Sequence, residues 1–254
     1  TGDPMWAEHC EEVAFNSYPA AVMPDFKALR YITCPNHAIS DSKNHHPGID
    51  NRGPFLSMNP FSSRCCQHNH AQGWPYFTEH LVLATPDNGV ATAIYAACKA
   101  TVKVGDGKEI TFREETNYPF EEGITFTVST DEKVAFPFYL RIPSWTQKAE
   151  VRVNGKKVSA APVAGKYLCI NREWANGDRV ELTLPMSLSM RTWQVNKNSV
   201  SVDYGPLTLS LKIAEKYVEK DSRETAIGDS KWQKGADPRK WPTTEIYPDS
   251  PWNY

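Results

Sequence analysis

The sequence predicts a multidomain α + β protein in which helices precede an antiparallel β-sandwich and the start of a second β module. Three observations support this fold class. Apolar residues recur with helical spacing near the N-terminus, the period changes to alternation after Asn88-Gly89, and turn signals then separate the alternating runs. The chain has 254 residues, of which 40% are hydrophobic, and is therefore long enough for more than one core.

The first helix is expected from Trp6 to Met23. Asp3 is its predicted N-cap, and Pro4 occupies the first helical position, where a missing amide costs nothing. Residues 24–63 follow as a long polar segment with one strand candidate, Leu29 to Thr33. A loop of this length in a compact domain is usually functional.

A second helix is expected from about Cys65 to Leu83. Gly73-Trp74-Pro75 lies inside this range, and proline lacks the amide that the helix needs. We therefore expect the helix to be interrupted and kinked at this point.

After Asn88-Gly89, eight runs with a two-residue period predict the β-sandwich. Asn154-Gly155 is a strong hairpin signal. The eight runs are Val90–Ala96, Ala100–Val104, Glu109–Glu114, Gly123–Ser129, Val134–Ile142, Glu150–Val153, Tyr167–Ile170 and Val180–Leu184. A further pair, Ser199–Tyr204 and Leu207–Ile213, is expected to open a second β module, and the sequence from Ala214 onward shows little periodicity.

The composition excludes two classes of partner. Lys and Arg number 28 against 30 Asp and Glu, so the net charge of −2 provides no basic excess for nucleic acid. The sequence also contains no apolar run of the roughly 18 residues that a membrane helix requires. We expect neither a nucleic acid nor a membrane as partner.

Residues suited to chemistry are concentrated in the N-terminal third. All seven histidines and four of the six cysteines lie within the first 80 residues. The sharpest cluster is Arg64-Cys65-Cys66-Gln67-His68-Asn69-His70, at the start of the second predicted helix. A thiolate is the form of cysteine that binds Zn²⁺ or attacks carbon, and a helix N-terminus beside an arginine stabilises it.

This cluster also has simpler interpretations. Free cysteines are often core residues, so Cys65 and Cys66 could pack inside a helix. A structural zinc module of Cys65, Cys66, His68 and His70 ranks last, because four ligands so close in sequence crowd a tetrahedral ion. The absence of a C-x-x-C pair also argues against a zinc finger.

Other candidate sites have ordinary explanations that we prefer. Glu8-x-Cys10 has the form of a ligand pair, but Glu8 is expected in solvent and Cys10 inside. His45-His46 is expected to be a solvated pair in the polar loop. Glu114-Glu115 and Glu121-Glu122 are carboxylate pairs, yet neighbours on a strand point to opposite faces, so we expect charges that protect a sheet edge.

Aromatic residues beside the cysteine pair form another candidate. Trp74, Tyr76 and Phe77 could make a platform for a sugar ring, and the core is the preferred interpretation. The same interpretation applies to the tryptophans of the predicted sandwich, which are Trp145, Trp174 and Trp193.

Several motifs together carry a resemblance to a known family. RCCQHNHAQGWPYFTEHLVLATPDNGVATAIYA, ETNYPFEEGITFTV, FPFYLRIPSW, VNGKKV and DYGPLTLSL occur in this order, and the sequence resembles the β-L-arabinofuranosidases of glycoside hydrolase family 127 and its sister families. The likeness covers most of residues 1–213. It implies that residues 1–86 are the C-terminal part of an (α/α)6 catalytic barrel and 87–187 a β-sandwich. Residues 188–254 are then expected to form a truncated second β module with an irregular tail.

The resemblance also implies roles for the cysteine pair. Cys65 matches the nucleophile, which forms a covalent thioglycosyl intermediate, and Cys65 and Cys66 both match zinc ligands. The implied activity is hydrolysis of L-arabinofuranosides or related plant-glycan sugars with retention of configuration. A metal held by these thiols would keep the nucleophilic sulfur deprotonated.

The resemblance implies that the family's remaining machinery precedes Thr1. In the family, a Glu-x-Cys pair that completes the zinc site and an acid/base glutamate lie in earlier helices, so we expect this chain to be a fragment whose partner is the missing barrel segment. We expect it to be inactive alone. It should bind zinc weakly unless His68, His70 or the pair Glu8 and Cys10 substitutes for the absent ligands.

A non-catalytic fragment that binds carbohydrate or serves as a scaffold is the alternative. That function would require a row of exposed aromatic residues on one sheet, whereas the enzyme requires Cys65 to face a cleft. The sequence leaves the sugar, the linkage, the oligomeric state and the compartment open.

Overall fold

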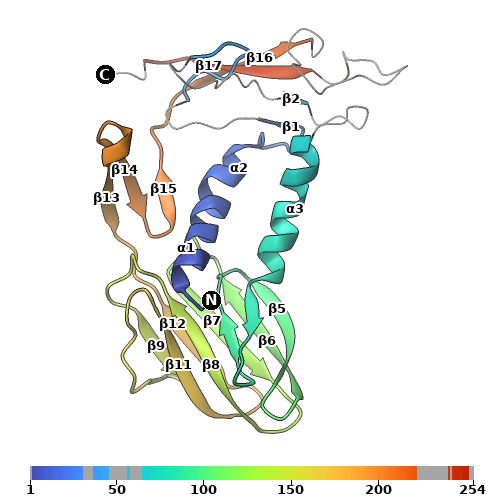
Figure 1. Cartoon of the computed structure of the whole chain (residues 1–254), viewed down its shortest axis with the longest axis vertical. Helices are drawn as coiled ribbons and strands as arrows, with labels where there is room; N and C mark the ends of the chain where they lie inside the picture. The colour runs from blue at the N-terminus through green and yellow to red at the C-terminus, as the bar shows by residue number, and fades with distance from the viewer. Residues whose placement is uncertain are drawn as a thin grey trace. The chain divides into compact units, whose positions relative to one another are not determined.

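The structure, a computed structural model, describes residues 2–30, 37–45, 56–57, 65–221, 240 and 242–251, and only the backbone of residues 56, 57 and 65. The chain divides into two compact units. The β unit comprises Thr1–Phe15 and Tyr76–Leu209, and the second unit comprises Asn16–Pro75 and Ser210–Tyr254. Figure 1 shows the elements of both units along the chain.

Helix α1 (Pro4–Glu12) begins where the sequence predicts a cap. Asp3 accepts a hydrogen bond from the Met5 amide at 3.0 Å, and Pro4 occupies the first turn. The helix continues as a π-helical turn (Val13–Ser17) and a short helix, α2 (Tyr18–Ala20). The predicted helix therefore exists but ends before Met23, because the chain turns there into strand β1.

Helix α3 (Cys65–Glu79) runs without a break through Pro75. The predicted interruption is therefore wrong, and so is the predicted end of the helix at Leu83. Residues Val82–Ala84 instead form strand β3, which pairs with β4 (Val90–Thr92) in antiparallel fashion. Apolar residues in so short a run fit either period, so the sequence did not separate helix from strand here.

The β unit is built around two sheets. Their strand orders are β10-β9-β12-β7-β6-β5 and β11-β8-β4-β3, and all pairings are antiparallel except that of β4 with β8. The further strands are β5 (Cys98–Val104), β6 (Lys108–Thr116), β7 (Gly123–Ser129), β8 (Val134–Ile142), β9 (Glu150–Val153), β10 (Lys156–Lys157), β11 (Lys166–Trp174) and β12 (Arg179–Thr183).

Both sheets contribute to one hydrophobic core. Phe112 and Phe126 from one sheet contact Phe138 from the other, with ring centroids 4.9 and 5.4 Å away. Trp174 is fully buried beside Phe136 and donates its indole N–H to the Phe136 carbonyl at 3.0 Å. Burying each such side chain stabilises the fold by about 1.5–3 kcal/mol.

Most strands lie close to their predicted positions, and β7, β8 and β9 have the predicted bounds. Asn154 and Gly155 both have positive φ, as the tight turn between β9 and β10 requires. The chain is mostly β-sheet with few helices, as expected at this coarse level. The (α/α)6 barrel, the sandwich and the domain boundaries at residues 86 and 187 stay predictions.

A three-stranded sheet follows in the β unit. It contains β13 (Leu188–Trp193), β14 (Ser199–Tyr204) and β15 (Leu207–Leu209), with a 3-10 turn (Gln194–Asn196) between the first two strands. The β14 strand has its predicted bounds, β15 ends earlier than predicted, and β13 was not predicted. On one face, Arg191 pairs with Glu12 at 2.5 Å and with Asp203 at 3.5 Å.

The second unit contains two strand pairs. Strand β1 (Ala28–Leu29) pairs with β2 (Leu56–Ser57), and β16 (Glu215–Lys220) pairs with β17 (Thr243–Pro248). The strand predicted at Leu29–Thr33 overlaps β1 at Leu29, and residues 31–36 lie outside the described residues. The β16–β17 pair corrects the expectation of an irregular tail. Strand β16 is mostly exposed and therefore lacks an alternating apolar pattern.

Candidate functional site

The predicted cysteine pair occupies the first two positions of α3. The Cys66 side chain is half-buried, whereas the Cys65 side chain lies outside the described part of the structure. Backbone amides at a helix start carry partial positive charge, which favours the thiolate. The placement agrees with the local argument from sequence, and the roles of Cys65 and Cys66 stay predictions.

The two histidines that follow the pair differ in their surroundings. His68 is exposed, whereas His70 is half-buried. The His70 ring stacks on the ring of Tyr18, with centroids 4.0 Å apart and an interplanar angle of 5°. His70 is therefore held by an aromatic partner that the sequence analysis did not anticipate.

Tyr18 and His70 also exchange two hydrogen bonds. The Tyr18 hydroxyl donates to the His70 carbonyl, and Nε2 of His70 lies 3.2 Å from the Tyr18 carbonyl. A carbonyl oxygen can only accept, so Nε2 is the protonated nitrogen. Burial raises the pKa of Tyr18, which keeps its hydroxyl a donor, although hydrogen bonds to the backbone of Trp74 and Gly73 oppose this rise.

The aromatic residues of α3 do not form one buried group. Phe77 is buried with Phe15 in a small core of the β unit. Trp74 is 41% exposed and Tyr76 59% exposed, so the expectation of core packing is right for Phe77 and wrong for the other two. Trp74 presents its ring edge to Tyr18 at 5.2 Å.

The tryptophans of the predicted sandwich also differ in burial. Trp174 lies in the core as expected, and Trp145 packs partly against it. Trp193 is 40% exposed and has Arg191 over its ring at 4.4 Å, so for this residue the expected core position is wrong.

The expectation that Cys10 lies inside is wrong, and Glu8, expected in solvent, is half-buried. Cys10 is exposed, whereas Glu8 accepts hydrogen bonds from the Ser144 amide at 2.8 Å and the Ser144 hydroxyl at 2.5 Å. The reason is a shift of helix phase, since Glu11 and not Cys10 is the buried residue of this turn.

Glu11 is the acidic residue that the sequence analysis missed. Its carboxylate is 1% exposed and pairs with Arg141, which is fully buried. It also accepts hydrogen bonds from the Tyr118 hydroxyl at 2.8 Å and the Tyr95 amide at 3.2 Å. Burial opposes the charge on Arg141, but Glu11 and the two tyrosines outweigh it and raise the Arg141 pKa.

Glu114 corrects the expectation of an edge charge. Its neighbour Glu115 is exposed and lies 3.1 Å from Arg113, but Glu114 is only 3% exposed. Glu114 accepts a hydrogen bond from the Ala96 amide at 3.1 Å. Burial raises the pKa of Glu114 well above its ordinary value, more than that amide lowers it.

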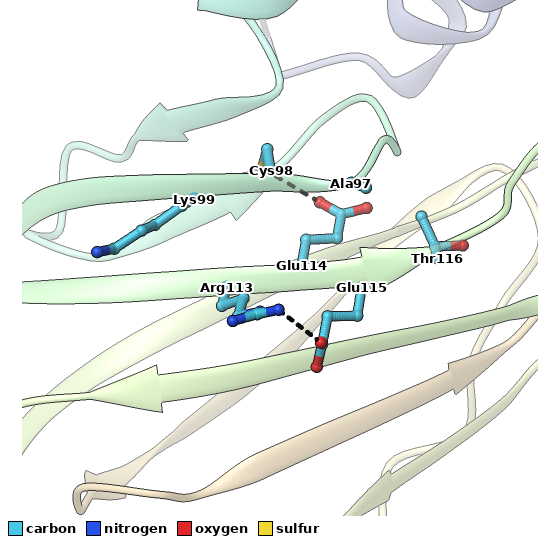
Figure 2. Close-up of a pocket in the computed structure, with 7 residues that line it drawn as sticks. All are labelled: Ala97, Cys98, Lys99, Arg113, Glu114, Glu115 and Thr116. Atoms are coloured by element: carbon cyan, nitrogen blue, oxygen red, sulfur yellow. Dashed lines mark hydrogen bonds and ion pairs between the residues drawn. The ribbon is translucent and has the colours of Figure 1, made fainter.

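A cavity of about 430 Å³ lies beside Glu114, where β5 begins and β6 ends. Figure 2 shows Cys98 and Glu114 joined on one side of the strands, with Arg113 and Glu115 joined on the other. Burial and the Glu114 charge raise the pKa of Cys98 to about 11. The cavity thus offers no thiolate, and Cys98 is poorly suited to act as a nucleophile.

The second carboxylate pair is divided in the same way. Glu122 accepts a hydrogen bond from the Met186 amide at 2.8 Å, so its carboxylate has a structural partner. Glu121 is exposed. Neither arrangement places two carboxylates together for acid/base work.

The loop histidine His45 is exposed, as expected. His45 lies 2.7 Å from the buried carboxylate of Asp41, and His46 lies outside the described residues. His37 contacts the Arg30 guanidinium, with 2.7 Å between Nε2 and the nearer nitrogen. Burial and the Arg30 charge lower the pKa of His37 to about 4, so this ring is neutral at neutral pH.

Two family models match the chain by sequence. The β-L-arabinofuranosidase GH127 catalytic domain matches residues 1–79, and the β-L-arabinofuranosidase GH127 middle domain matches residues 89–186. The chain belongs to the GH127 β-L-arabinofuranosidase family. The predicted pair Cys65 and Cys66 falls within the segment of this GH127 chain that matches the catalytic domain.

Solved structures with a similar fold are also glycoside hydrolases by description. One described as a glycoside hydrolase is 23% identical with a TM-score of 0.69, and the match covers 98% of this chain and 46% of that one. The GH127 β-arabinofuranosidase BT3674 is 20% identical with a TM-score of 0.65, covering 97% and 43%. A GH127 β-L-arabinofuranosidase from Geobacillus stearothermophilus T6 is 20% identical with a TM-score of 0.57, covering 96% and 44%.

At these identities the structural likeness concerns the fold alone. The GH127 chain spans less than half the length of each of these structures. No curated protein matches it by sequence. Among the described residues, no helix is long and apolar enough to cross a membrane.

The described part of the chain supplies only some of the donors for the zinc ion that the family resemblance implies. Two adjacent thiols at a helix start are donors of the kind zinc prefers. Within the described ranges, however, no three His, Cys, Asp or Glu side chains converge so as to hold a metal ion. A four-coordinate zinc at Cys65 and Cys66 would need donors beyond the described residues.

Proposed function

We propose that this GH127 chain is part of a retaining glycoside hydrolase that acts on L-arabinofuranosides or related plant-glycan sugars. The observation that carries the proposal is the catalytic-domain match over residues 1–79, which includes Cys65 and Cys66. The position of the pair at the start of α3 supports it, because a helix N-terminus favours a thiolate.

In the proposed mechanism, Cys65 is the nucleophile. Its sulfur attacks the anomeric carbon, the S–C bond forms, and the bond from that carbon to the leaving-group oxygen breaks. The leaving oxygen takes a proton from a general acid. Water then displaces the sulfur, and the two inversions together retain the configuration. A bound zinc ion would supply positive charge that keeps the sulfur deprotonated.

The alternative, a carbohydrate-binding or scaffold fragment, has less support. A binding sheet needs exposed aromatic rings, yet no aromatic side chain in the described strands of the two large sheets is exposed. Their phenylalanines and Trp174 are in the core instead.

A substrate with an activated leaving group tests the proposal on this chain. A dinitrophenolate departs without help from an acid, so the first displacement should proceed when only the nucleophile is present. With 2,4-dinitrophenyl β-L-arabinofuranoside, we expect release of at most one equivalent of dinitrophenolate and one arabinosyl group on Cys65, detected by peptide mass spectrometry.

Two variants control this experiment. Cys65→Ala should abolish both the release and the adduct, whereas Cys169→Ala, which removes an exposed thiol of the β unit, should change neither. An adduct on Cys169 or Cys10, or release that persists in Cys65→Ala, would remove Cys65 from the mechanism.

A further inference from the structure

The part of α3 that follows the cysteine pair has little burial of its own. Between Cys66 and Tyr76, where every side chain is described, none is buried, and Phe77 is the first buried residue. A helix of this length without a buried face is marginal in water. Contacts that hold this segment therefore matter for the position of its first turn.

Tyr18 provides such a contact through the helix backbone. Its hydroxyl donates to the His70 carbonyl, which is the usual acceptor for the amide of Trp74 one turn later. The Tyr18 oxygen also bonds the backbone at Gly73 and Trp74. The hydroxyl is thus inserted into the hydrogen-bond ladder of α3 just before Pro75.

Gly73 makes this insertion possible. A Cβ atom at this position would overlap the Tyr18 hydroxyl and ring. Glycine in a helix interior costs about 0.5–1 kcal/mol relative to alanine, so its presence here needs a packing reason. The close approach of Tyr18 is that reason.

We propose that Tyr18 and His70 form a clamp that positions the first turn of α3, and with it the Cys65–Cys66 pair. The clamp consists of the ring stack, the hydroxyl bond to the His70 carbonyl and the return bond from His70 Nε2 to the Tyr18 carbonyl. Its centre lies five residues after Cys65, or about 8 Å along the helix axis. Tyr18 is thereby a positioning residue for the reaction proposed above, on which this role rests.

Two measurements on the full chain test the clamp. The first is hydrogen exchange of the amides between Cys66 and Trp74, where Tyr18→Phe should accelerate exchange about fivefold through loss of one hydrogen bond. The second is the single-turnover release of dinitrophenolate as a function of substrate concentration. Here Tyr18→Phe should lower the limiting rate about tenfold and leave the half-saturating concentration unchanged, because a displaced nucleophile loses rate and not binding.

Conservative variants separate positioning from general destabilisation. His70→Gln keeps an N–H donor for the Tyr18 carbonyl and should retain most of the limiting rate, whereas His70→Leu should not. Tyr217→Phe removes another tyrosine hydroxyl of the second unit, bonded to Glu215, and should leave both measurements unchanged.

The outcomes distinguish this proposal from the proposed function. Unchanged exchange in Tyr18→Phe overturns the clamp. Faster exchange with an unchanged limiting rate overturns the positioning role. If the unsubstituted chain forms no adduct while Tyr18→Phe exchanges faster, the proposed nucleophile fails and the clamp stands as a contact of α3.

Discussion

The carboxylate of Glu11 and the guanidinium of Arg141 form an ion pair that is closed to solvent, with side-chain exposures of 1% and 0%. Glu11 comes from α1 and Arg141 from the C-terminal end of β8, so the pair joins the N-terminal helix to a sheet of the β unit. Arg141 also donates from Nε to the Ala93 carbonyl at 2.5 Å. A buried charge that is paired in this way becomes very costly when its partner is removed.

Glu11→Gln should therefore destabilise the β unit strongly. The substitution leaves the Arg141 charge buried without a counter-ion, and we expect a loss of about 3–5 kcal/mol in the free energy of unfolding. Urea unfolding followed by tryptophan fluorescence measures this loss. The control is Glu12→Gln on the same helix, whose half-buried, solvent-accessible pair with Arg191 is expected to contribute less than about 1 kcal/mol. Equal losses in both variants would contradict the assignment.

Glu114 should make stability fall as pH rises. Burial raises the folded-state pKa of Glu114, so between the ordinary glutamate pKa and that raised value the folded protein binds a proton that the unfolded chain has lost. The stabilisation is complete below the unfolded pKa and is lost as pH rises through the folded pKa. We expect Glu114→Gln to flatten the profile of unfolding free energy above the ordinary glutamate pKa.

Glu115→Gln is the matched control for this profile. Glu115 is the next residue on the same strand but points outward, where it pairs with Arg113. Its substitution should leave the pH dependence as it is in the unsubstituted protein. A steep profile that persists in Glu114→Gln would assign the effect to another group.

Phe138→Ala should destabilise the shared core of the two sheets. The Phe138 ring contacts Phe112, Phe126 and Trp174, so its removal leaves a cavity that both sheets line. We expect a loss of about 3–5 kcal/mol in the free energy of unfolding. Phe120→Ala, at a ring that is 76% exposed, should change it by no more than about 0.5 kcal/mol.

Zinc should bind this chain weakly and contribute little to the β unit. The β-unit core consists of apolar side chains and has no described metal ligand cluster, so EDTA should not shift its unfolding midpoint. After purification with zinc and dialysis, we expect well below one zinc per chain by elemental analysis and no turnover of unactivated arabinofuranosides. Stoichiometric zinc that is lost in Cys66→Ala would instead show that other donors complete the site.

The sequence predicted the sheets of the β unit better than the residues that join them to the helices. The mostly apolar residues FPFYLRI within the run FPFYLRIPSW predict a strand, and they lie in β8. The arginine in this run could have predicted a buried acidic partner, because a charge buried within an apolar strand is costly unless it is paired. That partner, Glu11, could not be read from the sequence. Its position depends on the phase of α1, which differs from the one we predicted.

The candidate site was predictable only in part for a related reason. Helical spacing and the cysteine pair placed Cys65 and Cys66 at the start of a helix, which is where α3 begins. The insertion of Tyr18 beside Gly73 depends on tertiary contact between distant segments, and no local pattern encodes it. Gly73 itself was the available signal, since a glycine inside a predicted helix implies a close neighbour.

The effect of Gly73→Ala on hydrogen exchange in α3 should change sign with the residue at position 18. In the unsubstituted protein the added methyl group overlaps Tyr18, so we expect faster hydrogen exchange in α3 despite the better helix propensity of alanine. In a Tyr18→Ala background the overlap is gone, and Gly73→Ala should slow exchange by the fewfold that its propensity gain of about 0.5–1 kcal/mol supplies. Four proteins complete the cycle, and protection of α3 by Gly73→Ala in both backgrounds would show that Tyr18 does not lie against the helix.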